Sequence, residues 1–180
     1  MSTDETRLVQ RAKEGDPAAF AELYDQYQPP IYRYIFYRVD DTATAEDLTS
    51  EVFVRLVERI DRFTYRGRPL LAWLYTIARN LVMDHHRRAG RSVPLSLDTP
   101  QVADTPDPEE TAEDSLAQQR LAAALSCITA DQREVIILKF IEGLDNETVA
   151  HMLGRSVGAI KALQHRALAA LRRVMKPNEG

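Results

Sequence analysis

The stretch from residue 144 to residue 173 constrains the fold most, because it reads as two helices joined by a tight turn. Asp145 is placed to cap a short first helix, Gly154 to give it a left-handed end, and Ser156 to cap a second helix. The inward face of that second helix is expected to hold Val157, Ile160, Gln164, Leu168, Leu171 and Met175. Two helices with a short glycine-containing turn predict a helix-turn-helix, whose second helix enters the DNA major groove.

The opposite side of this second helix is small and basic. Between residues 155 and 176 the chain has six positive charges and no acidic side chain. The six are Arg155, Lys161, Arg166, Arg172, Arg173 and Lys176. Small residues such as Gly158 and Ala162 would let the helix backbone approach a ligand closely. The pattern predicts contact with DNA phosphates, and a solvated basic end of an ordinary helix is the alternative.

The charge of the chain is distributed unevenly along the sequence. The net charge is −4, yet residues 62–91 carry +6 and residues 155–180 carry +5, whereas residues 92–116 carry −7. Because salt screens exposed charges beyond about 10 Å, a ligand meets the local charge and not the total. Two basic segments separated by an acidic one predict two nucleic-acid contacts on two separate bodies.

The acidic segment also predicts a domain boundary. Residues 92–116 contain four prolines, seven acidic side chains and no basic one, a composition typical of a flexible linker. The chain is therefore predicted to be all-α, with two small helical domains, 1–91 and 117–180, joined by this acidic linker. Each domain is expected to contain about four helices, and the second contains the helix-turn-helix.

Several local signals place the helices of the first domain. Residues 5–15 are predicted as a helix, and Asp16-Pro17 opens a second one that Pro29-Pro30 should break or kink. Thr44 with Asp47 predicts a capping box at the start of a third helix.

The segment 62–91 is predicted to be an aromatic and arginine-rich loop followed by an apolar helix with a basic end. In the loop, Phe63 and Tyr65 stand among arginines, which is the mixture that stacks and holds single-stranded bases. An ordinary helix connection also packs such rings against its neighbours. The residues leave both interpretations of these two rings open.

Other classes of protein are disfavoured. Cys127 is the only cysteine, so an internal disulfide is excluded, and it is predicted to be a small buried residue. His85 and His86 beside Asp84 diverge by about 100° per residue on a helix, so no metal, cofactor or catalytic site is expected there. Without an apolar run of about 18 residues, membrane insertion is not expected, and a cytoplasmic location is.

Three ordered motifs resemble the extracytoplasmic-function (ECF) sigma factors, the small two-domain branch of the bacterial sigma-70 family. They are AEDLTSEVF, AWLYTIARNLVMDHHRR and, after the acidic linker, QREVIILKFIEGLDNETVAHMLGRSVGAIKALQHRAL. The resemblance covers residues 17–174. It implies a protein that is not an enzyme and needs no cofactor, but that binds core RNA polymerase and promoter DNA and directs promoter-specific transcription initiation. An anti-sigma protein is a further partner that the resemblance implies.

The resemblance also implies which residues act. Those implied to read the minus-35 duplex are Arg155, Ser156, Gly158, Lys161, His165 and Arg166. Those implied to open and capture the minus-10 strand are Phe63, Tyr65, Arg79, Asn80, Asp84, Arg87 and Arg88. Those implied to bind the polymerase are Asp47, Leu48, Glu51, Phe53 and Arg55. The chain departs from the family's pattern at Ser50, where glutamine is common, and at Leu163, where a polar or basic residue is common.

Two other classes of function stay open on the sequence. A stand-alone helix-turn-helix transcriptional regulator would bind its operator tightly without polymerase. A nuclease centred on Asp84, His85 and His86 would require a divalent metal, and EDTA would silence it.

Overall fold

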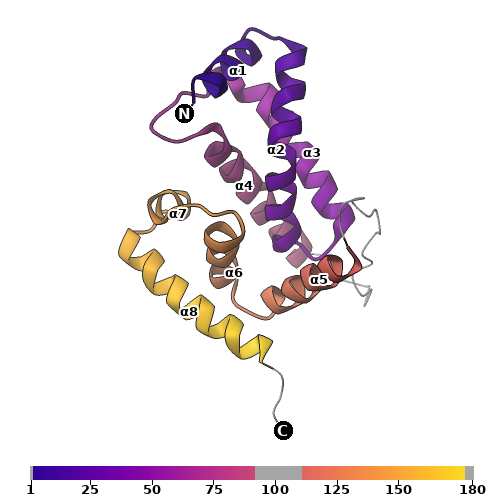
Figure 1. Ribbon diagram of the computed structural model, residues 1–180, viewed down its shortest axis with the longest axis vertical. Helices are drawn as coiled ribbons and strands as arrows, with labels where there is room; N and C mark the ends of the chain where they lie inside the picture. Colours follow the sequence, from indigo (N-terminus) through magenta and orange to yellow (C-terminus); the bar gives the residue numbers. More distant parts are fainter. Residues whose placement is uncertain (1, 92–110, 177–180) are drawn as a thin grey trace. The chain divides into compact units, whose positions relative to one another are not determined.

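The computed structural model describes residues 2–91 and 111–176, which form helices connected by short turns (Figure 1). The chain divides into two compact units, Met1–Gln101 and Val102–Gly180. The described residues contain no strand, which confirms the predicted all-α fold class. None of the described helices is long and apolar enough to cross a membrane.

The described part of the N-terminal unit has four α-helices and one 3-10 turn. They are α1 (Thr3–Lys13), α2 (Pro17–Arg38), α3 (Thr42–Arg59), η1 (Ile60–Arg62) and α4 (Leu70–Arg91). Helices α2, α3 and α4 pack against one another, and α1 lies against α2 and η1. The core includes the rings of Tyr34 and Tyr75, which meet edge-on with centroids 5.7 Å apart and are almost fully buried.

Helix α2 begins as predicted but has no break. The Asp16 carboxylate accepts a hydrogen bond from the Ala18 N–H at 3.0 Å, and Pro17 is the first helical residue. Pro29 and Pro30 lie inside α2, which continues past them to Arg38. Tyr27 and Ile31, on either side of the prolines, are both buried, so tertiary packing holds the helix together where two backbone donors are missing.

Helix α3 begins earlier than predicted. Its cap is Asp41, whose carboxylate accepts hydrogen bonds from the Thr44 N–H at 3.0 Å and the Thr44 hydroxyl at 2.6 Å. The bond from the Thr44 hydroxyl is the main reason that the pKa of Asp41 is lowered. The predicted capping box of Thr44 and Asp47 is therefore wrong, because Thr44 already lies in the first turn.

The described part of the C-terminal unit has four α-helices and one π-helical segment. They are α5 (Ala112–Ser126), α6 (Ala130–Ile136), η2 (Ile137–Ile141), α7 (Asn146–Leu153) and α8 (Val157–Met175). Helix α8 packs against α5, α6 and α7. Thr129 and Gln132 form the predicted capping box of α6. The regular helix predicted to follow through Ile141 is instead a π-helix in its last five residues.

Helix α5 corrects two predictions. It begins at Ala112, inside the segment predicted to be linker, because the Thr111 hydroxyl accepts from the Asp114 N–H at 3.2 Å. Acidic side chains in the first turn also stabilise a helix through its dipole. Glu113 and Asp114, which contribute to the acidic composition of the predicted linker, therefore favour the start of α5. The rest of that segment, residues 92–110, lies outside the described residues. Cys127 ends α5 and is exposed, so the prediction of a buried thiol is wrong.

Candidate nucleic-acid interface

The helix-turn-helix is built by the residues that predicted it. The Asp145 carboxylate accepts from the Thr148 N–H at 2.8 Å and so caps α7, which ends at Gly154 in the left-handed conformation, with φ +63°. The Ser156 hydroxyl then accepts from the Ala159 N–H at 3.1 Å and caps α8. The two caps accept hydrogen bonds from backbone N–H groups that have no partner within the helix, and Gly154 turns the chain out of α7. Local sequence therefore determines the turn between α7 and α8.

The buried face of α8 differs from the predicted one. Ile160, Leu163 and Ala167 are buried, whereas Leu168 is 41% exposed and Met175 is also exposed. The pattern favoured large apolar residues, but the small side chain of Ala167 lets α8 pack closely on its neighbours. Leu163, only 4% exposed, therefore belongs to the core and is turned away from the side that a ligand could reach.

The solvent side of α8 forms a continuous strip that we call the basic face. Its members are Gly158, Lys161, Ala162, His165, Arg166, Ala169, Arg172 and Arg173. At about 100° per residue, Gly158, Ala162 and Ala169 lie along the middle of this strip. Lys161 and Arg172 lie along one edge, and Arg166 and Arg173 lie along the other. The helix backbone is therefore accessible in the middle of the strip and carries cations on both edges.

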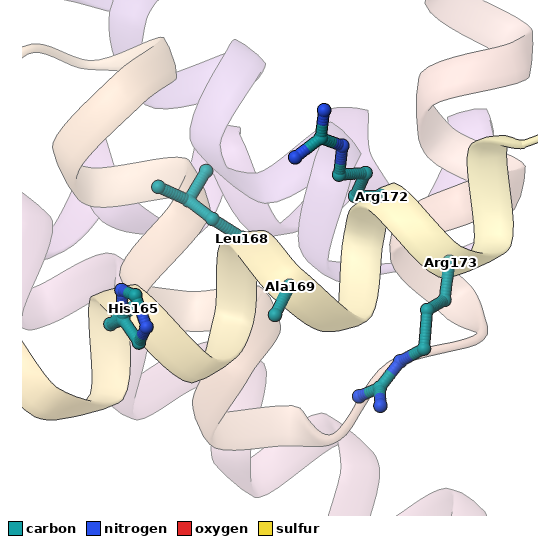
Figure 2. A pocket seen from close by; sticks show the side chains of 5 residues that line it. All are labelled: His165, Leu168, Ala169, Arg172 and Arg173. Atoms are coloured by element: carbon teal, nitrogen blue, oxygen red, sulfur yellow. The ribbon is translucent and has the colours of Figure 1, made fainter.

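The C-terminal half of the basic face is hollowed. A shallow depression of about 310 Å³ is lined by His165, Leu168, Ala169, Arg172 and Arg173. Figure 2 shows the side chains of Arg172 and Arg173 leaving α8 on opposite sides, with Ala169 between them. Arg172 and Arg173 belong to the predicted basic cluster but not to the residues implied to read the minus-35 duplex. Because they are consecutive in the sequence, they leave the helix in different directions, which the sequence alone could have indicated.

Arg155 is held by an acidic partner within the same unit. Its Nη2 atom donates to Oδ2 of Asp131, near the start of α6, at 2.7 Å. Both side chains are well exposed, so the pair is accessible to solvent and to a competing phosphate. In the free chain the Arg155 side chain therefore contacts Asp131, just before the start of α8.

In the N-terminal unit, the two loop rings have different environments. Phe63 is 7% exposed and its ring centroid lies 5.2 Å from that of Trp73, so it packs as part of the core. Tyr65 is 45% exposed. Of the two interpretations left open by the sequence, packing describes Phe63, whereas Tyr65 presents a ring that a base could reach.

Helix α4 presents a polar strip after this loop. Asn80 is exposed, and Asp84 forms an ion pair with Arg87 one turn later. Arg88 is exposed and Arg79 is half-buried. Asn80, Asp84 and Arg87 lie on the side of α4 that faces away from its buried residues, whereas Arg79 and Arg88 lie on opposite flanks of that side, about 180° apart.

One of the two adjacent histidines of α4 links two helices. His86 Nε2 lies 3.0 Å from the backbone carbonyl oxygen of Arg38, so this ring links the ends of α4 and α2. Within residues 2–91 and 111–176, no group of three or more His, Cys, Asp or Glu side chains is arranged to hold a metal ion.

Helix α3 presents a third surface. Asp47 is exposed, Leu48 is half-buried, and the Glu51 carboxylate accepts from the Arg55 Nε at 3.1 Å. Phe53 is buried against the ring of Tyr24, so it supports this surface from behind and does not form it. Two exposed valines that the sequence reasoning missed, Val54 and Val57, add apolar area to the same helix.

Comparisons of the sequence with known proteins agree on one family. The Sigma-70 region 2 family model matches residues 23–92, and the Sigma-70, region 4 model matches residues 118–171. The chain is 45% identical over 172 residues to the ECF RNA polymerase sigma factor BldN of Streptomyces coelicolor, covering 93% of this chain and 64% of that protein. It is 34% identical over 171 residues to the ECF RNA polymerase sigma factor SigD of Mycobacterium tuberculosis, covering 92% and 81%.

Solved structures show the same similarity. CnrH in complex with the cytosolic domain of CnrY aligns with a TM-score of 0.72 and 25% identity, covering 93% of this chain and 94% of that one. The sigma factor RpoE in complex with the anti-sigma factor NepR from Bartonella quintana aligns with a TM-score of 0.72 and 29% identity, covering 89% and 98%.

Proposed function

Because this chain belongs to the ECF sigma factors of the sigma-70 family, we propose that its two units recognise two forms of promoter DNA while core RNA polymerase holds both. The C-terminal unit binds the minus-35 element as duplex, and the N-terminal unit captures minus-10 bases from the opened non-template strand. The chain thereby directs promoter-specific transcription initiation. The observation that carries this proposal is the basic face of α8.

The basic face fits a duplex because its shape and charge agree with a major groove. A helix with its side chains is about 10–12 Å wide, and the major groove is about 12 Å wide. The small residues along the middle of α8 let the backbone descend toward base edges. Cations on the two edges, Lys161 with Arg172 and Arg166 with Arg173, are then placed to meet the phosphates of both strands.

Individual residues at the start of α8 have distinct parts in this proposal. Ser156 caps the helix, Gly158 keeps its first turn narrow, and Arg155 exchanges Asp131 for a phosphate. His165, in the middle of the basic face, is placed to reach base edges. These contacts position α8, and only those to bases carry sequence information.

The N-terminal unit captures bases that have left the stack. Unstacking costs a few kcal/mol per base, and stacking on an aromatic side chain returns roughly 1–3 kcal/mol. Tyr65 supplies the exposed ring and Asn80 supplies an amide for a base edge. Phe63 acts indirectly by anchoring the loop through Trp73.

The basic end of α4 guides the displaced strand. Arg87 and Arg88 meet its phosphates, and Asp84 orients Arg87 through their ion pair. Arg79, half-buried and two turns earlier, flanks Asn80 on the same helix. Strand opening in this proposal makes and breaks no covalent bond, so it requires neither a catalytic residue nor a cofactor.

Helix α3 is the docking surface for the polymerase. Asp47, Glu51 and Arg55 form a row of two acidic side chains and one basic one. Leu48 and Val54 add apolar area on the two flanks of this row. An anti-sigma protein is a further partner, since the solved relative RpoE is bound to the anti-sigma factor NepR. Such a protein inhibits by covering surfaces that polymerase or DNA would use. This function places the chain in the cytoplasm, where polymerase acts.

The experiment that tests this function combines the purified chain with core RNA polymerase of the source bacterium. We expect the two to co-elute in gel filtration, and we expect the complex to start transcription at defined sites on fragmented genomic DNA. Tight operator binding by the chain alone, with no co-elution, would instead identify a stand-alone regulator. DNA cleavage abolished by EDTA would identify a nuclease.

A further inference from the structure

Helix α1 contacts both ends of the loop between η1 and α4. At the start of the loop, the Lys13 Nζ donates to the backbone carbonyl oxygen of Phe63 at 2.6 Å. At its end, the backbone N–H of Leu70 donates to Oε1 of Glu5 at 3.0 Å. The two contacts join residues that are 50 and 65 positions apart in the chain, so α1 spans the loop from outside.

The Glu5 contact has the chemistry of a helix cap supplied by another helix. Leu70 is the first residue of α4, so its N–H has no acceptor within that helix. A carboxylate at this position is favoured both by the charge-assisted hydrogen bond and by the helix dipole. The same oxygen accepts from the Tyr27 hydroxyl at 2.9 Å, and burial together with this bond raises the pKa of Tyr27. Glu5 is therefore fixed between α2 and α4.

The remaining contacts of α1 fix the helix itself. Val9 and Ala12 are buried, and Arg11 forms ion pairs with Asp16 and Glu22 at 2.9 Å each. A helix held in this way is a rigid support for the loop that it spans. Inside the loop, Tyr65 is 45% exposed and Gly67 adopts φ +80°.

We propose that α1, which lies outside the stretch matching the region 2 family model, is a positioning element that fixes the base-capturing loop through Glu5 and Lys13. This inference rests on the proposed function. Neither residue touches DNA. Their effect is to hold Tyr65 and the start of α4 in one arrangement. The loop is then ordered before a base arrives, so base capture does not include the entropic cost of ordering it.

The test uses a double variant of the full chain, Glu5→Gln with Lys13→Met, bound to core RNA polymerase. The matched control is Asp4→Asn with Arg7→Met, which makes the same charge changes at exposed positions of α1. The probe is a fluorescent single-stranded DNA obtained by selecting a randomised pool on the wild-type holoenzyme. We expect the double variant to bind this probe at least about fivefold more weakly, because methionine at position 13 loses the hydrogen bond to the loop and glutamine at position 5 accepts from the Leu70 N–H without the negative charge, whereas the control should bind as wild type does.

Two further readouts separate positioning from simple destabilisation. Amide hydrogen exchange at residues 64–68 should accelerate in the double variant, while exchange in α2 and α3 and affinity for core polymerase stay unchanged. Lys13→Arg, which keeps a donor, should restore most of the binding lost in Lys13→Met. Unchanged probe binding by the double variant, or faster exchange across the whole N-terminal unit, would overturn the inference. If the wild-type holoenzyme selects no sequence at all, the proposed function itself fails.

Discussion

The two units differ in how their DNA-facing parts are held in place. In the C-terminal unit, α8 is positioned by groups within a few residues of it, namely the left-handed Gly154 and the cap Ser156. In the N-terminal unit, the loop before α4 is positioned by Glu5 and Lys13, which are far away in the sequence. A rigid helix suits a duplex whose groove has a fixed shape, whereas a braced loop suits bases that must be received one at a time.

The largest effect that we expect comes from Ala162→Glu in the middle of the basic face. The substitution places a carboxylate where the proposal puts the floor of a DNA groove, so minus-35 duplex binding by the holoenzyme should weaken by more than about tenfold. Binding to a single-stranded minus-10 probe should not change, because α8 takes no part in it. Ala117→Glu, at an exposed position of α5, is the control and should leave both unchanged. Filter binding or fluorescence anisotropy measures both, and equal loss on both probes would contradict the division between the units.

Gly154→Ala tests the local half of the comparison. With φ +63° and no other atom within 4 Å of an added Cβ, the cost is conformational and not steric. We expect the C-terminal unit to lose about 1–2 kcal/mol of unfolding free energy. The two units should then melt at separate temperatures in calorimetry, with only the C-terminal transition shifted. A shift of both transitions would show that the units do not fold independently.

Asp41→Ala removes the N-cap of α3 and so tests local stabilisation in the N-terminal unit, as Gly154→Ala does in the C-terminal unit. Loss of the α3 cap should reduce its unfolding free energy by about 1 kcal/mol near neutral pH, leaving the C-terminal unit unchanged. The pKa of Asp41 is lowered in the folded protein, so its contribution is present above the unfolded pKa and is lost as the pH falls through the folded one. The difference between variant and wild type should therefore shrink in strongly acidic solution, which urea unfolding at several pH values would measure. A difference that does not depend on pH would mean that the carboxylate charge is not the cause.

Asp131→Asn should have the smallest effect. An exposed ion pair contributes at most about 1 kcal/mol, so the stability of the C-terminal unit should hardly change. Duplex binding should improve by about two- to fivefold, because Arg155 no longer has to leave an acidic partner and a negative charge near the phosphates is removed. Weaker duplex binding would instead mean that Asp131 positions Arg155 for DNA. Titration of the variant with minus-35 duplex at two salt concentrations distinguishes the two.

The sequence predicted the features that depend on neighbouring residues and missed those that depend on residues far away in the chain. The caps Asp145, Ser156 and Thr129 and the end at Gly154 were predicted because each acts on backbone a few residues away. The role of Glu5 could not be predicted, since a carboxylate near the N-terminus carries no sign of the helix that it caps 65 residues later.

Two further features depended on packing that periodicity does not reveal. The sequence is compatible with Phe63 as a base-stacking ring or as a core residue, and its contact with Trp73 in the fold identifies it as a core residue. The buried face of α8 was misjudged because the small Ala167 packs closely while Leu168 stays exposed. The roles of the candidate site residues in polymerase and DNA binding remain predictions, since the folded chain fixes where these side chains lie and not what they bind.

The most direct test of the central claim is a paired measurement on holoenzymes containing Arg166→Ala or Asn80→Ala. Affinity is measured for a minus-35 duplex and for a single-stranded minus-10 probe, both selected from randomised DNA by the wild-type holoenzyme. We expect Arg166→Ala to weaken only duplex binding and to lower the slope of its salt dependence by about one, and Asn80→Ala to weaken only single-strand binding. If either substitution weakens both probes equally, the two units do not divide the DNA between them.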